Sequence, residues 1–164
     1  MTYAVAGARG IIGDPEKTIE DVHKWASARG GDVLVADAKA VFGRDHLETA
    51  VRHAMRAEAA KTMISHSVSM ETLRYLSAQR QVSDAIRVAG IRRGTRGLAI
   101  VAFGAASLDD LLAEFGWTRD DDVLRAERKS LRILGVSEAE AATVSPESQV
   151  DLVLEKVALL DVFR

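Results

Sequence analysis

The chain has 164 residues, a formal net charge of -2 at pH 7 and no cysteine. This length fits one domain with its own core, and the lack of cysteine excludes disulfides, zinc–thiolate sites and a cysteine nucleophile. No apolar run approaches the roughly 20 residues that a membrane span needs, and the N-terminal sequence lacks the pattern of a signal peptide. We therefore expect a soluble cytoplasmic protein with no membrane partner.

The N-terminal half of the chain alternates predicted strands and helices. Residues 2–12 are typical of a strand with a glycine-rich exit. Pro15 indicates the start of a helix, which Gly30 and Gly31 stop. The apolar face of this helix is expected at Ile19, Val22 and Ala26. Two further elements follow, a β-branched strand over 32–42 and a helix over 43–61.

A polar interruption divides the next helical region. Ser69 is expected to cap a helix whose apolar rhythm breaks at "SAQRQ", residues 77–81. The rhythm resumes at Val82, Ile86 and Ala89. This pattern predicts two helices, or one kinked helix, with the polar segment at the joint and Ser83 available to cap the second helix.

The C-terminal half contains one more buried strand, over 98–103, before several helical segments. Ser107 opens a capping box ahead of a short helix, and Ser137 offers a second cap. Pro146 lies where a first-turn proline is favoured, at the start of a C-terminal helix. The order of elements predicts a mixed α+β fold, with one small sheet of three to four strands and several α-helices in a single domain, residues 1–164.

Signatures of catalysis are lacking. The glycines at 7, 10 and 13 do not fit the dinucleotide-binding fingerprint, and no glycine–lysine pair provides a Walker loop. The histidines have no metal-ligand spacing, and no nucleophile elbow is present. We expect no catalytic residue, metal, cofactor or small-molecule substrate. An acid–base site built from Asp37, His46 and Glu48 is the enzymatic alternative.

The C-terminal helix carries two apolar stripes, whereas a lone surface helix needs only one. Either the helix is buried in the core of this domain, or one face is kept for a partner. The residues that we assign to partner binding are Val153, Val157, Leu160 and Phe163.

Positive charge gathers between residues 75 and 97, where five arginines face a single acid, Asp84. Guanidinium groups bind phosphate in a bidentate manner and stack on bases, and each neutralised phosphate releases counterions. The arrangement therefore suits nucleic acid. The alternative is that Arg80 and Gln81 cap helix ends and that the other arginines only improve solubility.

The middle of the chain, residues 37–57 and 63–86, resembles the PRPK-binding protein family, the small regulatory subunit of the KEOPS complex. The resemblance departs from the family where Ala78 replaces a common glycine and Met63 a common asparagine. The matching positions are Asp37, Ala38, His46, Leu47, Glu71, Leu73, Tyr75, Leu76, Ser77, Arg80, Gln81, Val82, Ala85 and Ile86.

The resemblance implies a non-catalytic protein, of the archaeal type, that binds and modulates the atypical kinase/ATPase subunit of KEOPS. It also implies help in recruiting tRNA by its 3′ CCA end for threonylcarbamoylation of adenosine. The tRNA contacts carried over are Arg80 and Gln81, with Ser77 in support.

Electrostatics alone adds three further candidates for RNA contact, Arg92, Arg93 and Arg96. The apolar faces of the C-terminal helix and of helix 46–57 are the candidates for kinase docking. The second interpretation is a pure adaptor that docks the kinase and never touches RNA.

Overall fold

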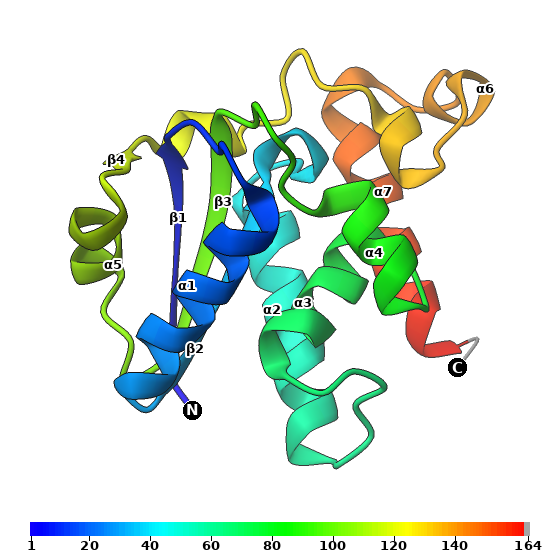
Figure 1. Ribbon diagram of the computed structural model, residues 1–164. Coiled ribbons are helices and arrows are strands. Elements are labelled where there is room, and N and C mark those ends of the chain that lie inside the picture. The colour runs from blue at the N-terminus through cyan, green and yellow to red at the C-terminus, as the bar shows by residue number, and fades with distance from the viewer. Residues whose placement is uncertain (163–164) are drawn as a thin grey trace.

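Three runs of small and β-branched residues form the long strands of one sheet. The computed structural model describes residues 1–162 (Figure 1). Strand β3 (Gly97–Gly104) lies between β1 (Tyr3–Arg9) and β2 (Gly31–Asp37), and the two-residue β4 (Thr118–Arg119) follows β1. Every pairing is antiparallel, and β2 is one edge of the sheet.

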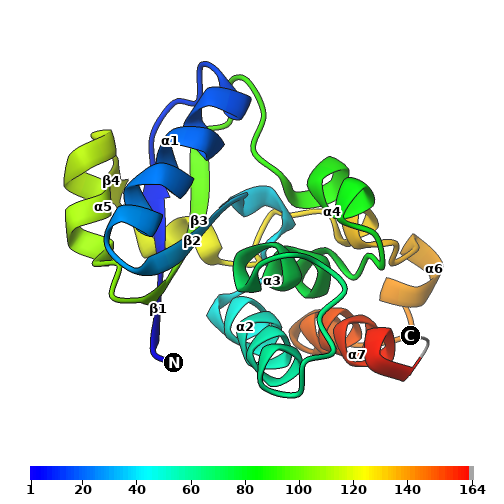
Figure 2. The ribbon, with the colours of Figure 1, turned by 60° about the horizontal axis from the view of Figure 1, so that its bottom comes forward.

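Helices cover both faces of the sheet, because side chains alternate along each strand and both sets are apolar. In β3, Val101 and Phe103 face one core cluster and Ile100 faces the other. Figure 2 shows α2, α3, α4 and α7 together on one side of the sheet. These helices are α2 (Arg44–Ala59), α3 (Val68–Ser77), α4 (Val82–Ala89) and α7 (Gln149–Val162); α1 (Pro15–Ala28) and α5 (Leu108–Phe115) pack on the other side.

Short helical segments complete the fold. They are the 3₁₀ turns η1 (Ala38–Ala40), η2 (Asp121–Leu124), η3 (Leu131–Leu134) and η4 (Pro146–Ser148), and the one-turn α6 (Glu138–Ala141). The predicted α+β class is confirmed, as a single α+β domain with a four-stranded sheet. No helix within residues 1–162 is long and apolar enough to cross a bilayer.

Capping chemistry places several helix starts where the sequence predicts them. Ser107 accepts a hydrogen bond from the N–H of Asp110, and Ser137 forms a complete capping box with Glu140. Pro15 occupies the first turn of α1 behind the Asp14 cap.

Four local predictions are wrong. The cap of α3 is Ser67 rather than Ser69, and Gln81 precedes α4 without any side-chain cap from Ser83. The predicted strand over 32–42 ends at Asp37, whose carboxylate accepts the N–H of Lys39 and starts the turn η1. The fourth concerns Pro146, which opens η4, a 3₁₀ turn before α7.

Candidate nucleic-acid interface

The polar segment between α3 and α4 is a four-residue joint, residues 78–81. Ala78 adopts the left-handed conformation, with φ 55° and ψ 37°, and the N–H of Gln79 donates to the carbonyl of Arg74 at 3.0 Å. This is the hydrogen-bond pattern of a Schellman helix end. The chain then turns into α4 after Gln81, which leaves both Arg80 and Gln81 exposed.

A buried ion pair holds the joint from below. Arg74 and Glu71 lie 2.8 Å apart, and Arg74 also donates to the backbone carbonyl of Arg80. Glu71 accepts N–H donors from Ile64 and Ser65 as well. Burial alone would raise the pKa of Glu71, but the bonds from Arg74 and from these two N–H groups hold that pKa below its ordinary value. The pair therefore stays charged, and it fixes the backbone position of Arg80.

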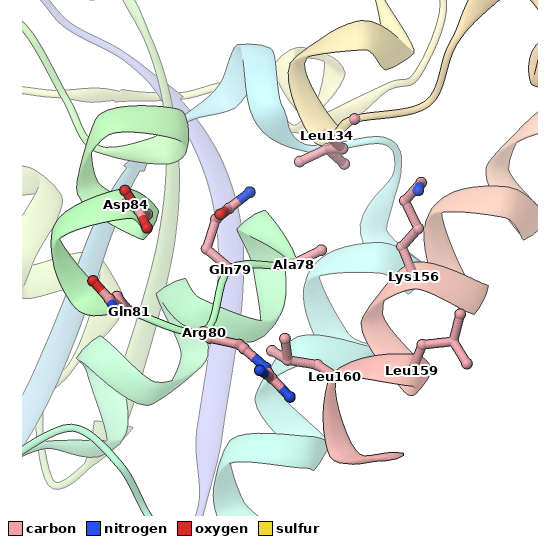
Figure 3. Close-up of a pocket in the computed structure, with 10 residues that line it drawn as sticks. Ala78, Gln79, Arg80, Gln81, Asp84, Leu134, Lys156, Leu159 and Leu160 are labelled. Carbon is pink, nitrogen blue, oxygen red and sulfur yellow. The ribbon is translucent and has the colours of Figure 1, made fainter. Parts of the chain in front are cut away.

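The joint forms one wall of a groove of about 560 Å³ (Figure 3). The opposite wall is α7, which contributes Lys156, Leu159 and Leu160, and η3 contributes Leu134. Figure 3 shows the Arg80 side chain extending beside Leu160, while Lys156 stands on the far wall. The groove thus combines exposed cations with an apolar surface.

This combination suits an extended nucleotide chain. The two cations, Arg80 and Lys156, stand on opposite walls and can each meet a phosphate. The leucines offer an apolar surface for a base, and the Gln81 amide can both donate and accept hydrogen bonds. No aromatic ring is among the described lining residues, so stacking would involve the Arg80 guanidinium.

Ser77 contributes from inside the protein rather than at the groove surface. It is fully buried, and its hydroxyl donates to the carbonyl oxygens of Leu73 at 2.8 Å and Arg74 at 3.2 Å. The hydroxyl therefore closes the last turn of α3 and has no direct access to a ligand.

The arginines of the basic stretch separate into two groups. Arg80 lies before α4, whereas Arg92, Arg93 and Arg96 are exposed on the loop after it. Eight helical residues span about 12 Å at ~1.5 Å each. Hydrogen bonds in both directions with the backbone of Ile12 fasten this second loop beside the Gly10–Gly13 turn. Arg80 lines the joint groove, and Arg92, Arg93 and Arg96 are not among the residues that line it.

The predicted partner stripe of α7 lies in the core. Val153 and Val157 have no exposed surface, since Val153 packs with Phe42 and Leu134 and Val157 packs in the core cluster that α2 and α3 share. The prediction that these two valines form a docking surface is therefore wrong for this conformation. Leu160 is almost buried and reaches the groove, and Phe163 lies outside the described residues. The apolar face of α2 is likewise buried.

The environment of His46 argues against the acid–base catalytic site that the sequence offered as an alternative. Its ring is fully buried, Nδ1 accepts the N–H of Phe42 and Nε2 donates to the carbonyl of Leu76, both at 3.0 Å. Burial lowers the pKa of His46 to about 4, so the ring is neutral near pH 7. Asp37 accepts hydrogen bonds from Lys39 and Thr95. Within residues 1–162, no cluster of acids and histidines could hold a metal ion.

Sequence reasoning missed Lys156 and Leu134 as groove residues. No local pattern marks them, because the fold alone brings them to the joint from more than fifty residues away. The Glu71–Arg74 pair was also missed, although its i,i+3 spacing on a predicted helix was a usable signal.

The chain matches a model of a protein family. The model for "Kinase binding protein CGI-121" covers residues 17–144, which is more than half of the chain and includes the joint. No curated protein sequence matches. The match agrees with the resemblance seen in residues 37–57 and 63–86, and with the non-catalytic environment of His46. The chain therefore belongs to the CGI-121 family of kinase-binding proteins, the non-catalytic kinase-binding subunits of KEOPS.

Proposed function

We propose that this protein, a single domain acting in the cytoplasm, regulates the KEOPS kinase/ATPase and recruits tRNA by its 3′ CCA end for threonylcarbamoylation. The observation that carries the tRNA part is the position of Arg80 and Gln81. Both are exposed on a fixed joint, and both line a groove whose opposite wall supplies Lys156. No small-molecule substrate or cofactor enters this proposal.

The groove suits a single-stranded end better than a duplex. Residues of both walls line one space of about 560 Å³, which suits unpaired bases with exposed edges. Arg80 would contact a phosphate or stack on a base, and Gln81 would read a base edge. Ser77 would support this contact indirectly, because it closes the helix that ends at the joint.

Trimming the tRNA tests this proposal directly. Fluorescence anisotropy is measured with a full tRNA and with the same tRNA lacking CCA, at two salt concentrations. We expect trimming to abolish most binding, and Arg80→Ala to weaken binding of the full tRNA by ~1–3 kcal/mol.

The matched control is Arg52→Ala, because Arg52 is exposed on α2 and, within residues 1–162, its side chain donates a hydrogen bond only to the neighbouring Thr49. It removes one positive charge away from the groove, and we expect little change. Equal binding to trimmed and full tRNA would mean that the protein binds RNA only through non-specific electrostatic attraction. If neither tRNA bound while kinase binding stayed intact, the result would favour the second interpretation, an adaptor that binds the kinase and never touches RNA.

A further inference from the structure

A second groove, of about 510 Å³, lies on another side of α4. Its walls come from α1, α3 and α4, which Figure 2 shows gathered around one end of β2. Of the described side chains that line it, all are apolar except that of Glu16. The apolar side chains include Pro15, Ile19, Met70, Leu73, Ile86 and Ile91.

Two of these residues are exposed although their helices place them on apolar faces. Ile19 belongs to the predicted inward face of α1 and is 39% exposed; Ile86 belongs to that of α4 and is 48% exposed. The two helices stand on either side of the groove, so each presents an isoleucine with no covering element within residues 1–162. Paired exposed isoleucines around an apolar hollow are typical of a protein interface.

Charge divides the border of this groove. The α1 side carries Glu16 inside the groove. On the α4 side, Arg87 and Arg92 follow directly after lining residues, and Arg93 is exposed beyond them. Arg87 pairs with Asp84 at 3.1 Å, whereas no carboxylate of residues 1–162 pairs with Arg93. One border therefore offers positive charge that the described chain leaves largely uncompensated.

We propose that this apolar groove, together with the loop of Arg92 and Arg93, is the surface on which the KEOPS kinase docks. The kinase would insert apolar side chains between Ile19 and Ile86 and set acidic side chains against the arginines. This inference rests on the kinase binding of the proposed function, and none of its evidence comes from the tRNA site. It assigns the loop arginines to a protein partner, and leaves Arg80 with RNA.

The chemistry of the groove favours a protein over RNA. Specific protein interfaces have an apolar, charge-depleted centre with arginine enriched, whereas nucleic-acid interfaces are polar and strongly basic. Among the described lining residues Glu16 alone is charged, and it would repel a phosphate. A groove and its border also suit the centre of an interface of about 800 Å² per partner.

The test measures equilibrium binding of the full chain to the purified KEOPS kinase. Ile86→Asp and Ile19→Asp should each raise Kd by about tenfold or more, since each places a charge at the apolar centre. Ile64→Asp is the matched control: Ile64 is 54% exposed but lies on the loop before α3, outside the groove. We expect its Kd to stay within about twofold of wild type.

The double charge reversal Arg92→Glu with Arg93→Glu tests the electrostatic part. It should slow association with the kinase, and added salt should reduce the difference from wild type. tRNA binding should be retained by this variant and by Ile86→Asp, whereas Arg80→Ala should weaken it. The two proposals can therefore fail separately.

Three results would overturn the inference. The first is wild-type kinase affinity for both isoleucine variants. The second is an arginine variant that loses tRNA but keeps the kinase, which would assign the loop to RNA. The third is a dimer of the protein alone that Ile86→Asp dissociates, because the groove would then hold a second copy of this chain.

Discussion

Ala78 holds a left-handed backbone conformation, with φ 55°, at the end of α3. A residue with a Cβ is disfavoured there by roughly 1–2 kcal/mol, and only part of this is recovered through its lower entropy in the unfolded chain. The N–H groups of Ala78 and Gln79 donate to the carbonyls of Tyr75 and Arg74, the Schellman pattern that goes with a left-handed residue at this position. A glycine would hold this conformation without the Cβ penalty.

We expect Ala78→Gly to stabilise the protein by about 1 kcal/mol, measured as the free energy of unfolding in urea. The matched control is Ala158→Gly, an exposed alanine inside α7, which should destabilise by about 1 kcal/mol. A loss of stability in both variants would contradict the left-handed assignment.

At the scale of elements, α7 is fastened to the rest of the fold near its C-terminal end. Asp161 accepts hydrogen bonds from the Tyr75 hydroxyl of α3 at 2.5 Å and from Nδ1 of His53 on α2 at 2.9 Å. The rings of Tyr75 and His53 stack with centroids 5.1 Å apart. This contact sets the position of the helix that forms the far wall of the joint groove.

Asp161→Ala should therefore destabilise the protein by roughly 1–3 kcal/mol, because the buried Tyr75 loses an acceptor. Hydrogen exchange in α7 should become faster. tRNA affinity should fall as well, because α7 forms the far wall of the joint groove. Glu155→Ala removes another acid from an exposed position of the same helix and serves as the control. Unchanged exchange in the Asp161 variant would mean that the apolar stripe alone holds α7.

The sequence predicted where helices begin better than it predicted which elements pack against one another. Caps such as Ser107 and Ser137 act through local hydrogen bonds, so their patterns located α5 and α6. The polar break at 77–81 likewise located the joint. The burial of Val157 and the exposure of Ile86 depend on which helix lies opposite, and periodicity within one helix carries no such information.

At the scale of the whole molecule, His46 ties the segment after η1 to the end of α3 in its neutral form. Its pKa is about 4 in the fold, because of burial, against 6.5 in a free chain. Below pH 6.5 this histidine is protonated in the unfolded chain but stays neutral in the folded protein. Its contribution to the free energy of unfolding is therefore fully present above pH 6.5 and is lost as pH falls towards 4.

Between pH 7 and pH 5, unfolding free energy should thus fall by about 2 kcal/mol from this residue. Urea unfolding at both values checks this. His46→Gln has no titrating ring, so its own stability should change much less over the same interval, whatever its starting value. The lowered pKa of Glu71 acts below about 4.5 and leaves this interval largely unaffected. An equal fall in both proteins would assign the effect to other groups.

Helix α4 belongs to both grooves: Asp84 in its first turn lines one, and Ile86 in its second lines the other. A body only eight residues long cannot shift at one wall without shifting at the other. With both proposals in place, kinase and tRNA would be thermodynamically linked. If kinase binding changed the affinity for tRNA by some factor, tRNA binding would change the affinity for the kinase by the same factor. Regulation of the kinase and recruitment of tRNA would then be two effects of the same coupling between the two binding sites.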